Sequence, residues 1–270
     1  MDANQGTGSK ASPKSLWRSV AVPSEHGGWS LTAEPVALGL IIAWSWSGLA
    51  LGAAAIVAFI ARTPLKLVLV DLWRRRWLPR SRLAVRILLA ELAIIALLGW
   101  AASAGSISRW FWVPLAIAVP LVAIELWFDM RSRGRRLVPE LAGTIGIGSV
   151  VAAILLIQDQ PTLLAVGVWV VVSARAIAAI PYARLQVARA HGRTVSLWHS
   201  DVPQLLAVVA VAFAWLSSMI PLAPVVAIVA VAGLNLSSVR GPVRRAVVIG
   251  IQQTIVGVVV VGVTAVAVLA

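Results

Sequence analysis

The chain has 270 residues, of which 60% are hydrophobic and only 12% are charged. Its mean hydropathy is +0.93, and a soluble domain carries roughly 25% charged residues, so a water-soluble globular fold is excluded. The absence of cysteine excludes disulfide bonds and thiol chemistry. The composition therefore predicts a membrane protein, with a formal net charge of +13.

A polar segment precedes a series of long apolar runs. Residues 1–28 contain no apolar core of signal-peptide length and are predicted to form a short cytoplasmic tail, followed by one transmembrane domain over residues 29–270. The apolar runs have the roughly 20 residues that a helix needs to cross a bilayer, and they are too long for barrel strands. The predicted transmembrane helices cover residues 29–47, 49–69, 83–103, 110–129, 137–157, 161–181, 202–219, 221–238 and 246–269. The predicted fold class is an all-α, polytopic transmembrane helix bundle with about nine spans.

The lysines and arginines favour one side of this bundle. Of the 23 cations, 22 lie in the first segment or in and beside the loops that follow the second, fourth, sixth and eighth predicted helices, and Arg109 is the exception. The positive-inside rule then places that side and the N-terminus in the cytoplasm, and the C-terminus outside. The charge indicates topology and contact with anionic lipid head groups in the bilayer. Because it is spread over five segments, nucleic-acid binding is not expected.

Charged residues also occur inside the predicted helices, all within their cytoplasmic halves. They are Glu34, Arg62, Lys66, Glu91, Glu125, Asp129, Glu140 and Arg175. Such residues usually face the interior of the bundle, pair with one another or with water, and mark functional sites. We therefore expect a polar cavity open to the cytoplasm, in which Arg62, Lys66 and Arg175 bind an anionic head group directly.

A purely structural interpretation of the same charges stays open. Long basic side chains can reach the head groups while their stems lie in lipid. Glu91 can pair with Arg86 or with the arginine of the sixth helix. Asp71, a further candidate for ligand binding, can pair with Arg74 and Arg75 in the next turn.

The start of the first helix carries two titratable residues, and a third lies inside it. The stretch VPSEHGGWSLTAEPVALGL, residues 22–40, has Glu25 and His26 beside a glycine pair, and Glu34 follows about two and a half turns later. An imidazole there can move a proton near neutral pH. We interpret Glu25, His26 and Glu34 as candidate catalytic residues at the cavity. In the alternative interpretation, Glu25 and His26 only favour the helix start, where an acid interacts well with the helix dipole.

A second group of polar residues follows the sixth predicted helix. If that helix continues past Pro181, residues seven apart share a face. The candidate ligand-binding residues in this region are Arg175, Tyr182 and Arg189 on one face, Arg184 and His191 on another, and His199 and Asp201 in the loop beyond. The histidine spacings fit no compact metal motif, so no metal ligand and no cofactor is assigned.

Three of these stretches resemble a known family. They are PSEHGGW at residues 23–29, RRLVPELAGT at residues 135–144, and PYARLQVARAHGR at residues 181–193 with the following SLWHSD. Together they resemble the YwiC-like family, bacterial integral membrane proteins of unassigned function. The resemblance implies a multi-pass protein of the bacterial inner (plasma) membrane, and it brings no reaction with it.

An analogy of architecture alone connects the chain to the UbiA-type intramembrane prenyltransferases, which also have nine spans and long polar loops after the second and sixth. Those enzymes hold a prenyl diphosphate through Mg²⁺ on two Asp-rich motifs. Here the first position offers only Asp71, and the second offers no carboxylate before Asp201. The analogy implies an enzyme acting on the anionic head group of a lipid or isoprenoid substrate. A transporter, which needs a polar path through the outer half, and a non-catalytic assembly or cofactor-handling protein remain alternatives.

Overall fold

The computed structural model describes residues 20, 26–131 and 136–270, although the side chains of residues 26 and 27 are outside its description. The described residues form helices joined by short loops, without strands. The helices are α2 (His26–Ile42), α3 (Trp46–Trp73), α4 (Pro79–Ala104), η1 (Arg109–Phe111), α5 (Trp112–Met130), α6 (Leu137–Ile157), α7 (Thr162–Ala190), α8 (Trp198–Leu216), α9 (Leu222–Arg240) and α10 (Ala246–Leu269). The predicted polytopic helix bundle is confirmed.

Eight of these helices, α3 to α10, are long and apolar enough to cross a membrane. The remaining helix, α2, has 17 residues and is about 25 Å long at 1.5 Å per residue. It packs against α3, α6, α7 and α10, so protein rather than lipid surrounds much of it. The expected cytoplasmic tail lies almost wholly outside the described residues. Val20 is an exception, and it is buried in an apolar cluster formed by α3 and α4.

Several helix boundaries differ from the prediction, and two of the differences have a clear structural cause. The break after α2 was placed at residues 46–48, but α3 already begins at Trp46. The side chain of Ser45 accepts a hydrogen bond from the backbone N–H of Gly48 at 2.9 Å, which makes Ser45 an N-cap. The sixth predicted helix ended at residue 181, whereas α7 continues through Pro181 to Ala190. The extra turns are stabilised by packing, because Tyr182 and Leu185 are buried against α9 and α10.

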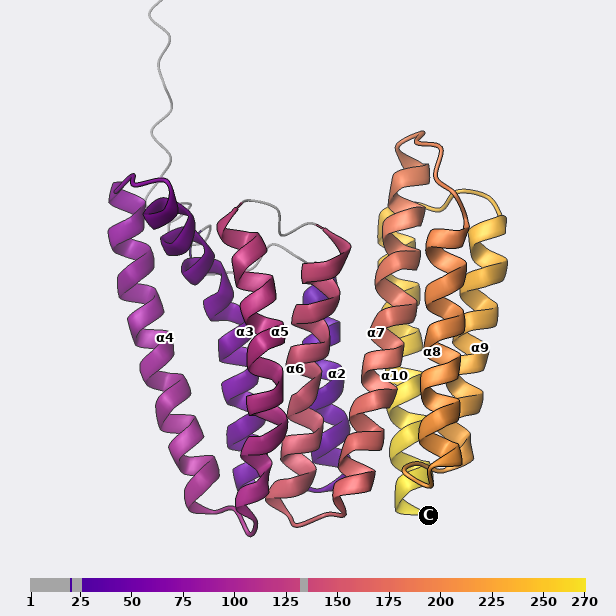
Figure 1. Ribbon diagram of the computed structural model, residues 1–270, viewed down its shortest axis with the longest axis horizontal. Helices are drawn as coiled ribbons and strands as arrows, with labels where there is room; N and C mark the ends of the chain where they lie inside the picture. Colours follow the sequence, from indigo (N-terminus) through magenta and orange to yellow (C-terminus); the bar gives the residue numbers. More distant parts are fainter. Residues whose placement is uncertain (1–19, 21–25, 132–135) are drawn as a thin grey trace, which may run out of the picture.

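Successive helices run in opposite directions, so the bundle has two distinct ends. In Figure 1 the ends of α3, α5, α7 and α9 lie at the upper edge, and the C-terminus lies at the lower edge. We call the upper end the basic face, because it carries the cation-rich connections. At the opposite end, the charged residues that the structure describes are Arg109 and Asp159.

The apolar core lies along α6 and α7. Residues 150–157 of α6 are all buried, and they pack with Leu38 of α2 and Val168 of α7. In contrast, α4 packs mainly against α3 and exposes a row of large apolar side chains. Glu34 on α2 and Arg175 on α7 are therefore buried beside this core, whereas α4 is a peripheral helix.

Candidate functional site

Two groups of charged side chains with buried carboxylates lie on the basic-face half of the bundle. The first, which we call the α3–α5 cluster, consists of Arg62, Lys66, Glu125 and Asp129. The second, which we call the α2–α7 pair, consists of Glu34 and Arg175. The prediction grouped Arg62, Lys66 and Arg175 as one anion site. In the structure each of these three cations lies beside a carboxylate, and Arg175 belongs to a separate centre.

The α3–α5 cluster is a closed set of ion pairs. Arg62 Nη2 lies 2.8 Å from Glu125 Oε1, and its Nε donates to Asp129 Oδ2 at 3.3 Å. Lys66 Nζ lies 2.8 Å from Asp129 Oδ1. The two cations are four residues apart on α3 and the two acids four apart on α5, so both pairs project from one helix face. The cluster has no net charge, which makes it a helix clamp rather than an open anion site.

A glycine on α6 makes room for this cluster. The carboxylate of Glu125 lies directly over Gly143, where any side chain would collide with it. Asp129 is completely buried, whereas the side chains of Arg62 and Lys66 are 24% and 37% exposed. The acids are thus held by close helix packing, and the cations reach them from the more open side.

The α2–α7 pair is buried and only partly satisfied. Arg175 is 1% exposed and Glu34 is 8% exposed. Arg175 Nη2 lies 3.7 Å from Glu34 Oε1 and donates to the backbone oxygen of Gln253 at 2.5 Å. Among the described residues, no hydrogen-bond partner is found for Arg175 Nε, Arg175 Nη1 or Glu34 Oε1. Because buried polar groups are nearly always hydrogen-bonded, these atoms mark the pair as the candidate site for a further polar group.

Helix α10 packs closely over the α2–α7 pair and buries it. The carboxylate of Glu34 lies against Gly257, and a side chain at that position would overlap its oxygen. Since α10 also supplies the carbonyl of Gln253, one helix both shields Glu34 and orients Arg175.

An amide network continues from this centre to α8, and sequence reasoning missed most of it. Gln253 Nε2 donates to Asn235 Oδ1 at 3.1 Å, and Asn235 Nδ2 donates to Gln204 Oε1 at 3.3 Å. Gln204 Nε2 then donates to the backbone oxygen of Ala178 at 2.7 Å. Gln204 and Asn235 carry no charge, so they attracted no attention. The sequence feature that could have identified them is the presence of amide side chains within apolar runs.

Because α7 continues past Pro181, Tyr182 and Arg189 lie on one face of it and contact α9. Tyr182 is buried, and its hydroxyl accepts a hydrogen bond from Gln186 at 3.3 Å. Arg189 donates to the backbone oxygens of Val239 and, at 3.1 Å, of Gly241. These carbonyls belong to the C-terminal end of α9, which a cation stabilises.

The other candidates make local or inter-helix contacts at the basic face. Arg184 pairs with Glu140 at 2.8 Å, which joins α7 to α6. His191 bonds to a backbone oxygen of its own helix, and His199 stacks on its neighbour Trp198. The predicted second face therefore does not bring Arg184 and His191 to a common partner.

Two acids also differ from their predicted pairing. Asp201 forms a bidentate pair with Arg240, at 2.7 and 3.1 Å. Asp71 was expected to pair with Arg74 and Arg75, but its ion pair is with Arg80 at 3.6 Å.

For three of the candidate site residues, the structure describes no side-chain partner. Glu91 has a buried Oε2 with no hydrogen-bond partner, and no ion pair joins it to the residues that the structure describes. Its proposed pairing with Arg175 is replaced by that of Glu34. Glu25 lies outside the described residues, and of His26 only the backbone, at the start of α2, is described. Within the described part of the chain, no three histidines or acids lie together as metal ligands would.

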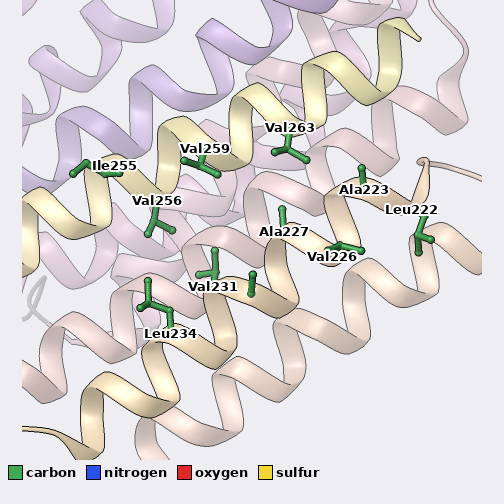
Figure 2. A pocket seen from close by; sticks show the side chains of 11 residues that line it. Leu222, Ala223, Val226, Ala227, Val231, Leu234, Ile255, Val256, Val259 and Val263 are labelled. Carbon is green, nitrogen blue, oxygen red and sulfur yellow. The ribbon is translucent and has the colours of Figure 1, made fainter.

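One groove in the membrane region is apolar. It has a volume of about 650 Å³ and lies between α9 and α10 (Figure 2). Its lining consists of Leu222, Ala223, Val226, Ala227, Ala230, Val231, Leu234, Ile255, Val256, Val259 and Val263. Aliphatic side chains offer no group for acid–base or anion chemistry. This groove therefore supplies no candidate catalytic residue.

Comparison with known proteins agrees with the motifs at the start of the chain. The chain has no match among the curated proteins or the solved structures. The family model described as YwiC-like protein matches residues 22–155, which cover α2 to α5 and nearly all of α6. The first two predicted motifs lie within that range, and the third, residues 181–193, lies beyond it. On this match over residues 22–155, the chain belongs to the YwiC-like family.

Proposed function

We propose that this YwiC-like protein is an enzyme of the bacterial inner membrane that acts on the anionic head group of a lipid or isoprenoid at the cytoplasmic face. Arg175 binds the head group and Glu34 transfers a proton. Glu25 and His26, at the start of α2, belong to the entrance of the same site.

The proposal rests above all on the unused donors of Arg175. A guanidinium has a planar fork of N–H groups that matches phosphate and carboxylate oxygens. Two of the three guanidinium nitrogens of Arg175 lack a partner among the described residues, although the side chain is 1% exposed. Arg62, by comparison, has carboxylates at two of its nitrogens. An anion between Arg175 and the amide network would satisfy the buried donors.

Proton transfer by Glu34 is supported by its position. Its unpartnered Oε1 is the oxygen closest to Arg175, so an anion bound to the guanidinium would lie beside a carboxyl group. General acid–base catalysis requires this kind of contact and contributes a factor of about 10²–10⁴ in rate.

The distribution of charge favours an enzyme over a transporter. The charged side chains of the described helices lie in the half nearest the basic face or near the middle, apart from Arg109 at the opposite end. Transporters place binding groups near the midplane and need a polar route to both sides. The far half of this bundle offers buried hydroxyl groups, such as those of Ser149 and Thr264, but no second charged route.

Mass spectrometry of amphiphiles that co-purify with the protein tests the proposal. We expect wild type to retain an anionic amphiphile and Arg175→Gln to lose it, with affinity reduced roughly tenfold to hundredfold, because a hydrogen bond to a charged group contributes about 1.5–3 kcal/mol. Glu34→Gln should retain the compound. Cells that express Glu34→Gln should then lack the product that wild type generates.

A double variant separates binding from folding. Arg175→Gln alone leaves Glu34 buried and unpaired, which can destabilise the protein. Glu34→Gln combined with Arg175→Gln removes both charges, so it should melt like wild type and still lose the amphiphile. If the double variant retains the compound at the wild-type level, Arg175 is not the head-group site. Equal lipid profiles in cells with wild type and Glu34→Gln would exclude the catalytic role.

A further inference from the structure

The turn between α3 and α4 is a rigid structure in the most basic part of the chain. Ser81 Oγ donates to Asp71 Oδ2 at 2.6 Å and accepts from the backbone N–H of Leu78 at 3.1 Å. Arg80 lies 3.6 Å from the same carboxylate, which is 1% exposed. This buried acid therefore fixes the start of α4 and pairs with Arg80.

Two other arginines of α4 are left without a partner. Arg82 and Arg86 are exposed, and neither forms an ion pair or a side-chain hydrogen bond with a residue that the structure describes. Since they are four residues apart, they project from one face of α4. A cavity of about 420 Å³ lies beside this face, and its lining is formed by Trp77, Leu78, Pro79, Arg82, Leu83 and Arg86.

The surroundings of this cavity are those of a membrane interface. It lies where α4 begins, at the basic face, and Trp77 is 51% exposed beside it. Tryptophan is enriched at the level of the lipid head groups. Further along α4, Leu89 and Leu92 are 61% and 48% exposed, so they offer an apolar surface below the two arginines. Cations above and exposed leucines below match the two parts of a phospholipid.

We propose that this cavity binds the phosphate of an anionic phospholipid from the cytoplasmic leaflet. Arg82 and Arg86 donate to the phosphate oxygens, since guanidinium groups bind phosphate through paired, charge-assisted hydrogen bonds. Trp77 packs against the glycerol region, and the acyl chains lie along Leu89 and Leu92. This site is separate from the α2–α7 pair, because α4 packs mainly against α3 and contributes nothing to the centre around Arg175.

A charge-matched pair of variants tests the site. The protein in an uncharged detergent is titrated with dioleoyl-phosphatidylglycerol, and bound lipid is counted by native mass spectrometry. Arg82→Gln/Arg86→Gln should weaken the tightest lipid-binding step at least tenfold, because both phosphate contacts are lost. Arg193→Gln/Arg245→Gln removes the same charge from exposed positions at the basic face, outside the cavity, and should change that step less than threefold.

Three further measurements decide what occupies the cavity. Phosphatidylcholine should bind equally to wild type and to both double variants at this step. Inorganic phosphate at millimolar concentration should not displace the lipid, and displacement would instead assign the cavity to free phosphate. If both double variants weaken lipid binding equally, general surface charge rather than this cavity binds the lipid. If neither weakens lipid binding, the proposed site is wrong. All four substitutions are at exposed positions, so the melting temperatures should match wild type.

Discussion

Arg62 and Arg175 differ in how fully their charge is matched. Arg62 has Glu125 and Asp129 beside it, whereas Arg175 has one carboxylate at 3.7 Å and two nitrogens without a partner. A transmembrane arginine that is fully paired can stabilise helix packing, while an incompletely paired one is costly unless a ligand completes it. Residue type and depth are therefore not enough to assign function, and the partners decide it.

Replacing the two glycines below the buried acids should destabilise the fold. A Cβ at Gly143 would collide with the Glu125 carboxylate, and one at Gly257 with that of Glu34. Overpacking a well-packed interior costs about 1–3 kcal/mol. Gly143→Ala and Gly257→Ala should therefore lower the melting temperature in detergent. Gly250→Ala is the matched control, because a Cβ there meets open space and alanine favours a helix. Unchanged melting of both test variants would contradict the described packing.

Removing one acid of the α3–α5 cluster should cost more than removing a surface acid. Asp129 is completely buried and faces both Arg62 and Lys66. Asp129→Asn should destabilise the protein by about 3 kcal/mol, the lower end for a buried pair because both cations are partly exposed. Asp201→Asn breaks the exposed pair with Arg240 and should cost much less, because solvent screens exposed ion pairs. Chemical unfolding followed by circular dichroism compares them, and equal losses would contradict a clamp.

At this scale the sequence predicted which charged residues lie in the membrane, but not how they pair. Depth follows from position along an apolar run, so the inward location of Glu34, Asp129 and Arg175 was correct. Pairing depends on which helices are neighbours, and no local pattern contains that. The expected partners of Asp71 were therefore wrong. The contribution of Gln204 and Asn235 was missed because amides, unlike charges, do not stand out at membrane depth.

At the scale of helices, the local sequence predicts where helices lie, whereas packing between helices sets some of their ends. Apolar length placed the nine α-helices that the structure describes between residues 26 and 270, and apart from the end of α7 their ends lie close to the predicted ones. The start of α3 needed the capping side chain of Ser45, which the apolar pattern ignored. The end of α7 lies nine residues beyond Pro181, because burial of Tyr182 and Leu185 outweighs the local preference to stop. Tertiary contacts thus decided the boundary that sequence could not.

Arg189 should stabilise the end of α9 from a neighbouring helix. Its guanidinium donates to the carbonyls of Val239 and Gly241. A cation at a helix C-terminus contributes about 0.3–1 kcal/mol when exposed and up to about 2 kcal/mol when partly buried. Arg189→Gln should therefore speed amide hydrogen exchange in the last turn of α9, with little change in α8. Arg193→Gln, four residues later in the loop, is the control and should leave that exchange unchanged. Equal amide hydrogen exchange in wild type and Arg189→Gln would contradict the proposed capping of α9 by Arg189.

At the scale of the whole molecule, the charge pattern and the helix directions agree. The predicted topology required the segments before the first helix and after the second, fourth, sixth and eighth to lie on one side. In the structure the ends of α3, α5, α7 and α9 do lie at one edge (Figure 1). The α4 cavity lies at this basic face, and the buried α2–α7 pair lies on the same half of the bundle. The assignment of the basic face to the cytoplasm is therefore the premise that they share.

Cysteine labelling tests this premise without background, because the chain has no cysteine. Thr194→Cys places a thiol in the exposed α7–α8 loop at the basic face, and Ser106→Cys places one at the opposite end, between α4 and η1. A membrane-impermeant maleimide should label position 106 in intact cells and position 194 only in inverted membrane vesicles, since cation-rich loops remain inside. Labelling of position 194 in intact cells would show that the bundle has the opposite orientation in the membrane. The α2–α7 pair and the α4 cavity would then face outward, and neither a cytoplasmic head-group enzyme nor a lipid of the cytoplasmic leaflet would fit them.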